Sequence, residues 1–245
     1  MGSSHLRKAS YRTDWRCVVL CALAFAAADA SNAATHDHPT QAEPAPGYAD
    51  LEFSPPQPGT YELPPLGVAA DGAVLSADGS ARSLYDLIGA KVTVLSFIYT
   101  SCSDVNGCPL AGYVLRGVAN KIDADPALRD RVRLLSISFD PAHDTPAVMS
   151  AYGARFRSGA GATDWQFLTT AGPTQLEPIL AAYDQWTQKD YAPDGRYLGS
   201  MSHILRVYLI DRQRRIRNIY TMSFLHADLV MNDIRTLLLE SAPRQ

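Results

Sequence analysis

Two cysteines lie directly after a strongly apolar stretch near the middle of the chain. Residues 92–99 read VTVLSFIY, and this run of β-branched and aromatic side chains predicts a strand that is buried on both faces. Cys102 and Cys108 follow it, and Pro109 then occupies the position that proline prefers at the start of a helix. Sulfur atoms between a buried strand and a helix N-terminus are accessible and paired, so they could exchange disulfides or bind a soft metal ion.

A histidine further along the chain is a candidate third partner for the two sulfurs. His203 lies just before another apolar stretch, although taken alone it fits a hydrogen-bonded structural histidine better than a ligand. Met201, two positions earlier, either offers a thioether or simply packs. Asp140 follows a second apolar stretch, where it either approaches the cysteines or simply forms an Asp-Pro turn. We expect His143, in a turn, and His226, near a helix N-terminus, to be solvated.

The other two cysteines, Cys17 and Cys21, lie in a segment with the pattern of a secretory signal. Four basic residues precede an apolar run at residues 17–28, and small residues follow it. The run is shorter than the roughly 20 apolar residues that span a bilayer. We therefore predict a signal peptide over residues 1–33, with an uncleaved membrane anchor as the alternative.

The composition is that of an ordinary globular protein, with 47% hydrophobic and 19% charged residues. Loss of residues 1–33 removes four cations and two anions, which changes the formal net charge from −3 to −5. A mildly acidic protein is a poor candidate for binding nucleic acid, so we expect no such partner. Residues 34–58 carry several prolines and no apolar period, which predicts a flexible lead-in to a single domain over residues 59–245.

An exported protein with only two cysteines left could use them as a structural disulfide. A domain of this size does not need one, and a bridge that closes so short a loop stabilises little. Redox or metal chemistry is therefore the favoured interpretation, and the structural bridge stays the alternative.

Apolar periodicity and turn residues divide the domain into alternating strands and helices. This order predicts a thioredoxin-like α/β fold, a three-layer sandwich around a central mixed sheet. We predict strands at residues 61–66, 73–75, 92–99, 132–139, 165–168, 205–210 and 216–220, helices at residues 83–88, 109–122, 146–156, 174–186 and 227–239, and a long polar loop at residues 187–202.

Three segments, in the order that this fold requires, resemble the Sco (SenC) family of copper-binding thioredoxin-like proteins. They read FIYTSCSDVNGCP, LLSISFDPAHDTPAVMSAYGARF and MSHILRVYLID. The resemblance implies that Cys102, Cys108 and His203 bind copper as Cu(I) or Cu(II). It also implies a metallochaperone, periplasmic or associated with the inner membrane, that assists assembly of the copper centre of cytochrome c oxidase. The oxidase subunit that holds this centre, or another copper or thiol protein, would be its partner.

The thiol loop departs from that family in one respect. The family places three residues between its cysteines, whereas five residues, 103–107, intervene here. Comparison with the motif places the insertion at Asn106-Gly107, a dipeptide that favours a tight turn with positive φ. Such a turn either bulges outward and leaves the sulfurs close together, or spreads them and changes the donor geometry.

The same cysteines support a second function that needs no metal. A periplasmic thiol–disulfide oxidoreductase would use Cys102 and Cys108 as its catalytic redox pair and would not need His203. At the expected N-cap of a helix, Cys108 is expected to have a lowered thiol pKa, with Cys102 as the freer sulfur. A peroxide-handling protein on the same fold is a third alternative, although no arginine precedes the cysteines as that chemistry would require.

Overall fold

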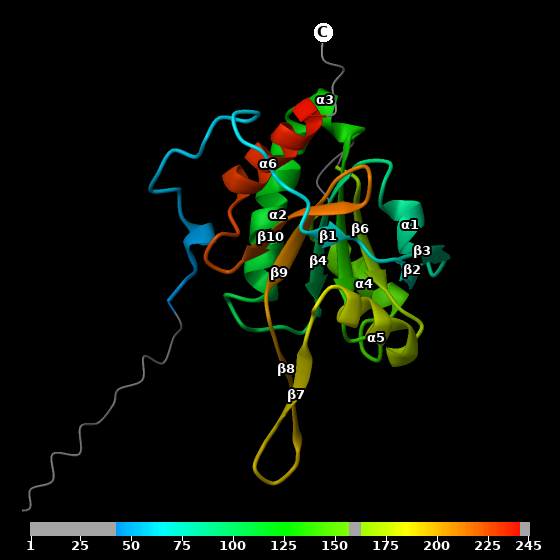
Figure 1. Ribbon diagram of the computed structural model, residues 1–245. Coiled ribbons are helices and arrows are strands. Elements are labelled where there is room, and N and C mark those ends of the chain that lie inside the picture. Colours follow the sequence, from blue (N-terminus) through cyan, green and yellow to red (C-terminus); the bar gives the residue numbers. More distant parts are fainter. Residues whose placement is uncertain (1–42, 157–162, 241–245) are drawn as a thin grey trace, which may run out of the picture. The chain divides into compact units, whose positions relative to one another are not determined.

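The computed structural model describes residues 43–156 and 163–240, which form an α/β unit around one large sheet (Figure 1). The strands are β1 (Gly67–Val68), β2 (Ala73–Ser76), β3 (Ala81–Ser83), β4 (Val92–Ile98), β5 (Val132–Ser138), β6 (Trp165–Thr169), β7 (Thr187–Tyr191), β8 (Tyr197–His203), β9 (Arg206–Ile210) and β10 (Arg215–Thr221). The helices are the short 3₁₀ helix η1 (Pro46–Tyr48), α1 (Leu84–Leu87), α2 (Cys108–Asp123), α3 (Pro126–Arg129), α4 (Pro146–Ala154), α5 (Pro173–Ala182) and α6 (Ala227–Glu240).

The large sheet is mixed, with strand order β1-β10-β9-β4-β5-β6-β2-β3. Strands β4, β5 and β6 run parallel, and β4 pairs with β5 without a register shift from Val92 opposite Val132 to Ile98 opposite Ser138. On its other side β4 pairs antiparallel with β9. Every residue of β4 is buried, as expected of the apolar run that precedes the cysteines.

Helices cover both faces of this sheet. On one face the Ser96 and Ser136 hydroxyls and the Trp165 indole are joined by hydrogen bonds, and α2, α4 and α6 pack over that face. Because side chains alternate along a strand, Phe97 points to the opposite face, where its ring contacts Tyr183 at the end of α5. The thioredoxin-like three-layer sandwich with a central mixed sheet is therefore confirmed.

A buried carboxylate joins the carboxyl ends of β4 and β5 just before the thiol loop. The Asp144 side chain is fully buried and accepts hydrogen bonds from the Thr100 N–H at 3.0 Å and from the Ser138 hydroxyl at 2.5 Å. The Thr100 hydroxyl also donates to it. The position at which the thiol loop leaves the sheet is therefore fixed by strand pairing and by this carboxylate.

The strand predicted at residues 61–66 is wrong. Only Gly67–Val68 pair with the neighbouring strand β10, and this short β1 forms one edge of the sheet. Pro64 and Pro65 lack the N–H groups that a ladder requires, so the preceding residues cannot continue the pairing.

The polar loop predicted at residues 187–202 is also wrong, because this segment forms a two-stranded hairpin, β7 and β8. The hairpin extends beyond the large sheet in Figure 1 and leads directly into β9. The Asp190 carboxylate binds the hydroxyls of Ser200 and Ser202 across it. Polar side chains on both faces give no apolar alternation, so periodicity does not reveal these strands.

The predicted leader at residues 1–33 lies outside the described residues, as does the first part of the lead-in. The described part, residues 43–58, contacts the domain through η1, which packs on α2. In the described ranges, no helix has both the length and the apolar character that a membrane span needs.

We predict that Asp144→Ala lowers the free energy of unfolding by about 2–4 kcal/mol. The substitution leaves a buried N–H and two hydroxyls at the ends of β4 and β5 without their acceptor. Urea unfolding followed by circular dichroism measures the change. His143→Ala, at an exposed neighbouring position, is the control and should be close to neutral. Equal effects of the two substitutions would contradict the role assigned to Asp144.

Candidate metal centre

Three side chains from three separate elements meet at the carboxyl edge of the sheet. Cys102 lies in the loop after β4, Cys108 is the first residue of α2, and His203 ends β8. Their ligand atoms all lie within 4.8 Å of one another, and Cys108 Sγ is 3.6 Å from His203 Nε2. No other group of three or more His, Cys, Asp or Glu side chains in the described ranges brings its ligand atoms together in this way.

Both cysteines are free thiols, and the longer thiol loop keeps their sulfurs close. Of the two geometries that the sequence left open, the structure has the outward bulge. Cys108 is buried, whereas Cys102 and His203 are only half-buried. A soft donor set is therefore assembled with one side near solvent.

The bulge is a β-turn rather than the positive-φ turn expected at Asn106-Gly107. Gly107 N–H donates to the Asp104 carbonyl at 2.9 Å, and Asn106 N–H donates to the Asp104 carboxylate at 3.0 Å. Gly107 has φ of −96° and Asn106 is not among the residues with positive φ. A Cβ atom at Gly107 would lie 3.4 Å from Cys102 Sγ, so this turn packs directly against the sulfur.

Tyr99 contacts both the thiol side and the imidazole side of the cluster. Its N–H donates to Cys108 Sγ at 3.5 Å. Its hydroxyl accepts from the Met201 N–H at 3.3 Å and lies 3.4 Å from the Met201 carbonyl, to which it can donate. Its ring meets the His203 ring edge-on at 5.9 Å, and the Phe139 ring lies 4.9 Å from His203. Sequence reasoning counted Tyr99 as a strand residue and gave no sign of this second role.

The two thiols have opposite pKa shifts. The pKa of Cys102 is lowered to about 4, chiefly because the Cys108 thiol donates a hydrogen bond to its sulfur. His203 and the N–H groups of Cys108 and Asp104 add hydrogen bonds to the thiolate, and together these outweigh partial burial.

The expectation that the helix terminus lowers the pKa of Cys108 is therefore wrong. Its pKa is raised, first because its proton is shared with the Cys102 thiolate and then because its side chain is only 1% exposed. Cys108 is also the first helical residue rather than the N-cap, which is Gly107. Burial and the neighbouring negative sulfur outweigh the helix terminus.

The weaker sequence candidates lie around the cluster or away from it. Met201 is buried among core residues, and the Asp140 carbonyl closes the turn that the Asp-Pro pair predicted. His143 is exposed as expected. The expectation for His226 is wrong, because it is only 8% exposed and its Nε2 lies 2.9 Å from the Ala49 carbonyl.

The donor set suits a soft, low-coordinate metal ion. Two sulfurs and one imidazole nitrogen converge, and thiolates bind Cu(I) readily while imidazole binds either oxidation state of copper. A structural zinc ion normally has four protein ligands, and the cluster offers three. The same two sulfurs are also close enough to exchange disulfides with a partner.

Comparison with solved structures finds Sco proteins that have a similar fold. Bradyrhizobium japonicum ScoI with copper bound shares 27% identity, with a TM-score of 0.53 over 67% of this chain and 99% of that one. Arabidopsis thaliana ScoI with copper bound shares 22% identity, with a TM-score of 0.59 over 71% and 99%. BsSco, described as a member of the Sco family of cytochrome c oxidase assembly proteins, shares 21%, with a TM-score of 0.54 over 71% and 95%. The two structures below 25% identity support the fold alone.

Comparison of the sequence with protein families identifies the family of this chain. No curated protein matches the chain. The family described as SCO1/SenC matches residues 71–239, which include the thiol loop, the Asp-Pro turn and the histidine before β9. Because this match extends over most of the chain and agrees with the fold, the chain belongs to the SCO1/SenC family.

Proposed function

We propose that this protein is a copper metallochaperone that binds one copper ion through Cys102, Cys108 and His203. Its cargo would be delivered to the copper centre of cytochrome c oxidase. The observation that carries the proposal is the convergence of two free thiols and one imidazole within 4.8 Å. The copper-bound ScoI of Bradyrhizobium japonicum, at 27% identity, supports the same cargo.

The protein side chains would prepare and shield the copper ligands. Cys102 already has the thiolate form near neutral pH, whereas Cys108 must lose its proton before its sulfur can bind a metal. The rings of Tyr99 and Phe139, which contact each other, both pack against the His203 imidazole. The half-exposed Cys102 sulfur leaves a side from which a partner's ligands could approach.

The proposed function also includes a role in oxidase assembly and a location outside the cytoplasm. The chain belongs to the SCO1/SenC family, and BsSco is described as a member of the Sco family of cytochrome c oxidase assembly proteins, so family membership supports the role. The basic and apolar N-terminal pattern supports export to the periplasm, with the inner membrane as the alternative location. The partner would be the oxidase subunit that holds the copper centre.

We predict that the reduced protein binds one Cu(I) and that His203→Ala weakens this binding at least about 100-fold. Loss of a metal ligand should cost no less than loss of an outer-shell partner, which typically costs 10–100-fold. Competition with a chromophoric Cu(I) chelator under anaerobic conditions measures the affinity. His143→Ala, an exposed histidine outside the cluster, should bind as the wild type does. Unchanged affinity in His203→Ala would remove this imidazole from the site.

In cells, we predict that loss of the protein lowers the copper content and activity of cytochrome c oxidase when copper is scarce. Complementation with the wild-type chain should restore both, and Cys108→Ser should not, because it removes a sulfur donor. Copper analysis of purified oxidase and respiration with reduced cytochrome c provide the measurements. Full restoration by Cys108→Ser would contradict the assembly role.

The thiol pair supports a second candidate function, a thiol–disulfide reductase. The accessible Cys102 thiolate would attack a partner disulfide, which forms a mixed disulfide and releases one partner thiolate. Cys108, after losing its proton, would then attack Cys102 Sγ, which releases the second partner sulfur and leaves a Cys102–Cys108 disulfide. The partner gains the two electrons that the pair loses. The observation that favours this function is the accessible, low-pKa sulfur beside a buried one.

We predict a flat pH profile for alkylation of Cys102 in the metal-free, reduced protein. Thiolate is the reactive form, so a thiol with a pKa of about 4 stays reactive from about pH 8 down to about pH 5 and loses reactivity only below that. An ordinary thiol, with a pKa of about 8.5, would lose about tenfold per pH unit over this range. Iodoacetamide labelling followed by mass spectrometry measures the rate at each cysteine. A tenfold change per unit at Cys102 would contradict the lowered pKa.

A further inference from the structure

The N-terminal segment of residues 43–49 is held by the thiol loop itself. The Asn106 side chain uses both ends of its amide, with Nδ2 donating to the Glu43 carbonyl and Oδ1 accepting from the Ala45 N–H, each at 2.8 Å. These two bonds resemble one rung of a sheet, although the partners are more than 60 positions apart in the chain. Asn106 is half-buried and Ala45 is only 5% exposed, so the bond to Ala45 is partly shielded from solvent, whereas the bond to Glu43 is exposed.

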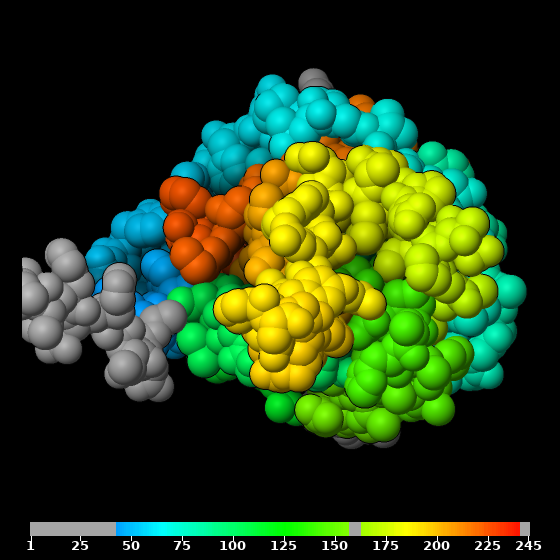
Figure 2. Space-filling model, turned by 90° about the horizontal axis from the view of Figure 1, so that it is seen from below, coloured from blue at the N-terminus to red at the C-terminus, as the bar shows by residue number. Residues whose placement is uncertain are grey.

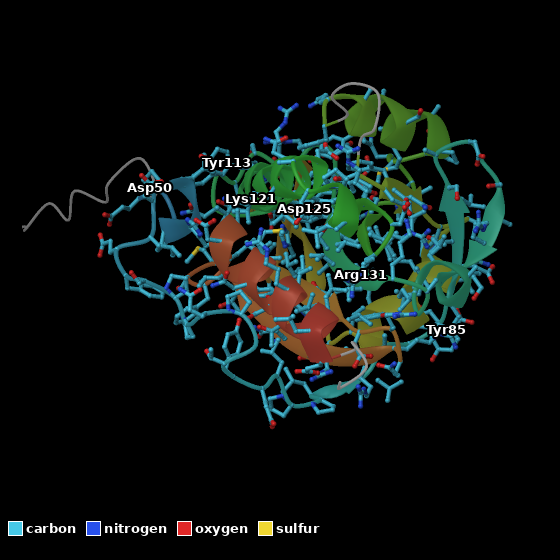
Figure 3. The ribbon with its side chains drawn as sticks, turned by 90° about the horizontal axis from the view of Figure 1, so that it is seen from above. Asp50, Tyr85, Tyr113, Lys121, Asp125 and Arg131 are labelled. Carbon is cyan, nitrogen blue, oxygen red and sulfur yellow. The ribbon has the colours of Figure 1, made fainter. Side chains whose placement is uncertain are left out.

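A tyrosine makes a second contact between the segment and the loop. The Tyr48 hydroxyl donates to the Val105 carbonyl, one residue before Asn106. Its ring lies 5.0 Å from the ring of Tyr113 on α2. Figure 3 shows Tyr113 on α2 at the side where the segment that carries Asp50 lies, and Figure 2 shows the blue segment beside the green of the thiol region.

The segment is itself firmly anchored on the domain. Gly47 is buried, and a Cβ atom there would lie 2.2 Å from the Leu225 carbonyl and 3.1 Å from a methyl of Leu110. The Ala49 carbonyl lies 2.9 Å from Nε2 of the buried His226. The segment is therefore a fixed support for the loop rather than a loose tail over residues 43–49.

The thiol loop has few other restraints. Within the described ranges, hydrogen bonds from residues 103–107 stay inside the loop, continue into α2 or end on the segment of residues 43–49. The side chains at residues 103–105 are exposed. Asn106 lies within the turn that packs against Cys102 Sγ, and only Gly107 separates it from Cys108 at the start of α2. A displacement of Asn106 would therefore move the support of both sulfurs.

We propose that Asn106 is a positioning residue for the candidate metal centre. By clamping the backbone of Glu43 and Ala45, it keeps the enlarged loop folded so that both sulfurs face His203. The inserted Asn106-Gly107 pair lengthens the loop, and the same asparagine supplies the hydrogen bonds that hold the longer loop to the N-terminal segment. This inference rests on the proposed copper function, which it deepens by assigning the group that sets the sulfur geometry.

Two substitutions remove hydrogen bonds between Asn106 and the N-terminal segment, one at Asn106 and the other at Ala45. Asn106→Ala removes both bonds. Ala45→Pro removes only the N–H that donates to Asn106 Oδ1. The backbone φ of −62° at Ala45 already suits proline. Ser103→Ala, at an exposed position in the same loop, is the matched control. Thermal unfolding of all variants in the full chain shows whether each one folds.

We expect Asn106→Ala and Ala45→Pro each to weaken Cu(I) binding roughly tenfold or more, as loss of an outer-shell partner does at metal sites. The double variant should lose little more than Asn106→Ala alone, because Asn106→Ala already removes the bond that Ala45→Pro removes. The charge-transfer spectrum of the Cu(II)-loaded protein should also change, which a purely structural loss of stability would not cause. Ser103→Ala should match the wild type in each measurement.

A probe that needs no copper separates this inference from the proposed function. Dibromobimane becomes fluorescent when it bridges two nearby thiols, so its rate of cross-linking in the metal-free protein reports how the sulfurs are held. We expect slower cross-linking in Asn106→Ala and Ala45→Pro than in Ser103→Ala. If the wild type fails to bind copper, the proposed copper function is wrong. The cross-linking rates of the variants still test the role of Asn106 in that case. Equal cross-linking and equal Cu(I) affinity in all folded variants would overturn the inference.

Discussion

The contacts of Tyr99 join the two halves of the candidate metal centre. The sulfurs come from the loop after β4 and the imidazole from the end of β8, and Cys108 and His203 are 95 positions apart in the chain. Tyr99 donates its N–H to Cys108 Sγ and bonds the Met201 backbone through its buried hydroxyl. Buried polar groups must find partners, and β8 lies outside the large sheet. The hydroxyl and the Met201 backbone satisfy each other, and this fixes the strand end that carries His203.

The parts of the fold that local patterns specify could be predicted from the sequence. The buried strand β4 has an uninterrupted apolar run, and α2 and α4 have proline in their first turn, at Pro109 and Pro146. Of these elements, β4 and α2 position the cysteines, so the place of the cysteines in the fold followed from residue types alone. The relative pKa values of Cys102 and Cys108 did not, because burial and the thiol–thiol hydrogen bond exist only in the folded chain.

The role of Asn106 also could not be predicted from the sequence, because its contacts form only in the folded chain. In the sequence, Asn106-Gly107 has the form of a local turn, and nothing nearby indicates that the amide binds a backbone more than 60 positions earlier. The N-terminal segment likewise lacks an apolar period, because it is held by backbone groups, by the close approach of Gly47 to Leu225 and by the Tyr48 ring, which follow no regular spacing. Contacts of this kind follow from three-dimensional fit, which periodicity does not encode.

The position of the Cys108 proton links the two chemistries of the pair. Metal binding and disulfide formation both require this buried sulfur to lose its proton, and its side chain is only 1% exposed. Beside it lie the Cys102 sulfur, which already accepts a hydrogen bond from it, the Tyr99 N–H at 3.5 Å and His203 Nε2 at 3.6 Å. Both chemistries also use the same sulfur atoms, so a chain that holds the disulfide cannot hold copper through them. The arrangement that assembles a copper site therefore also makes its occupancy depend on the redox state of the thiols.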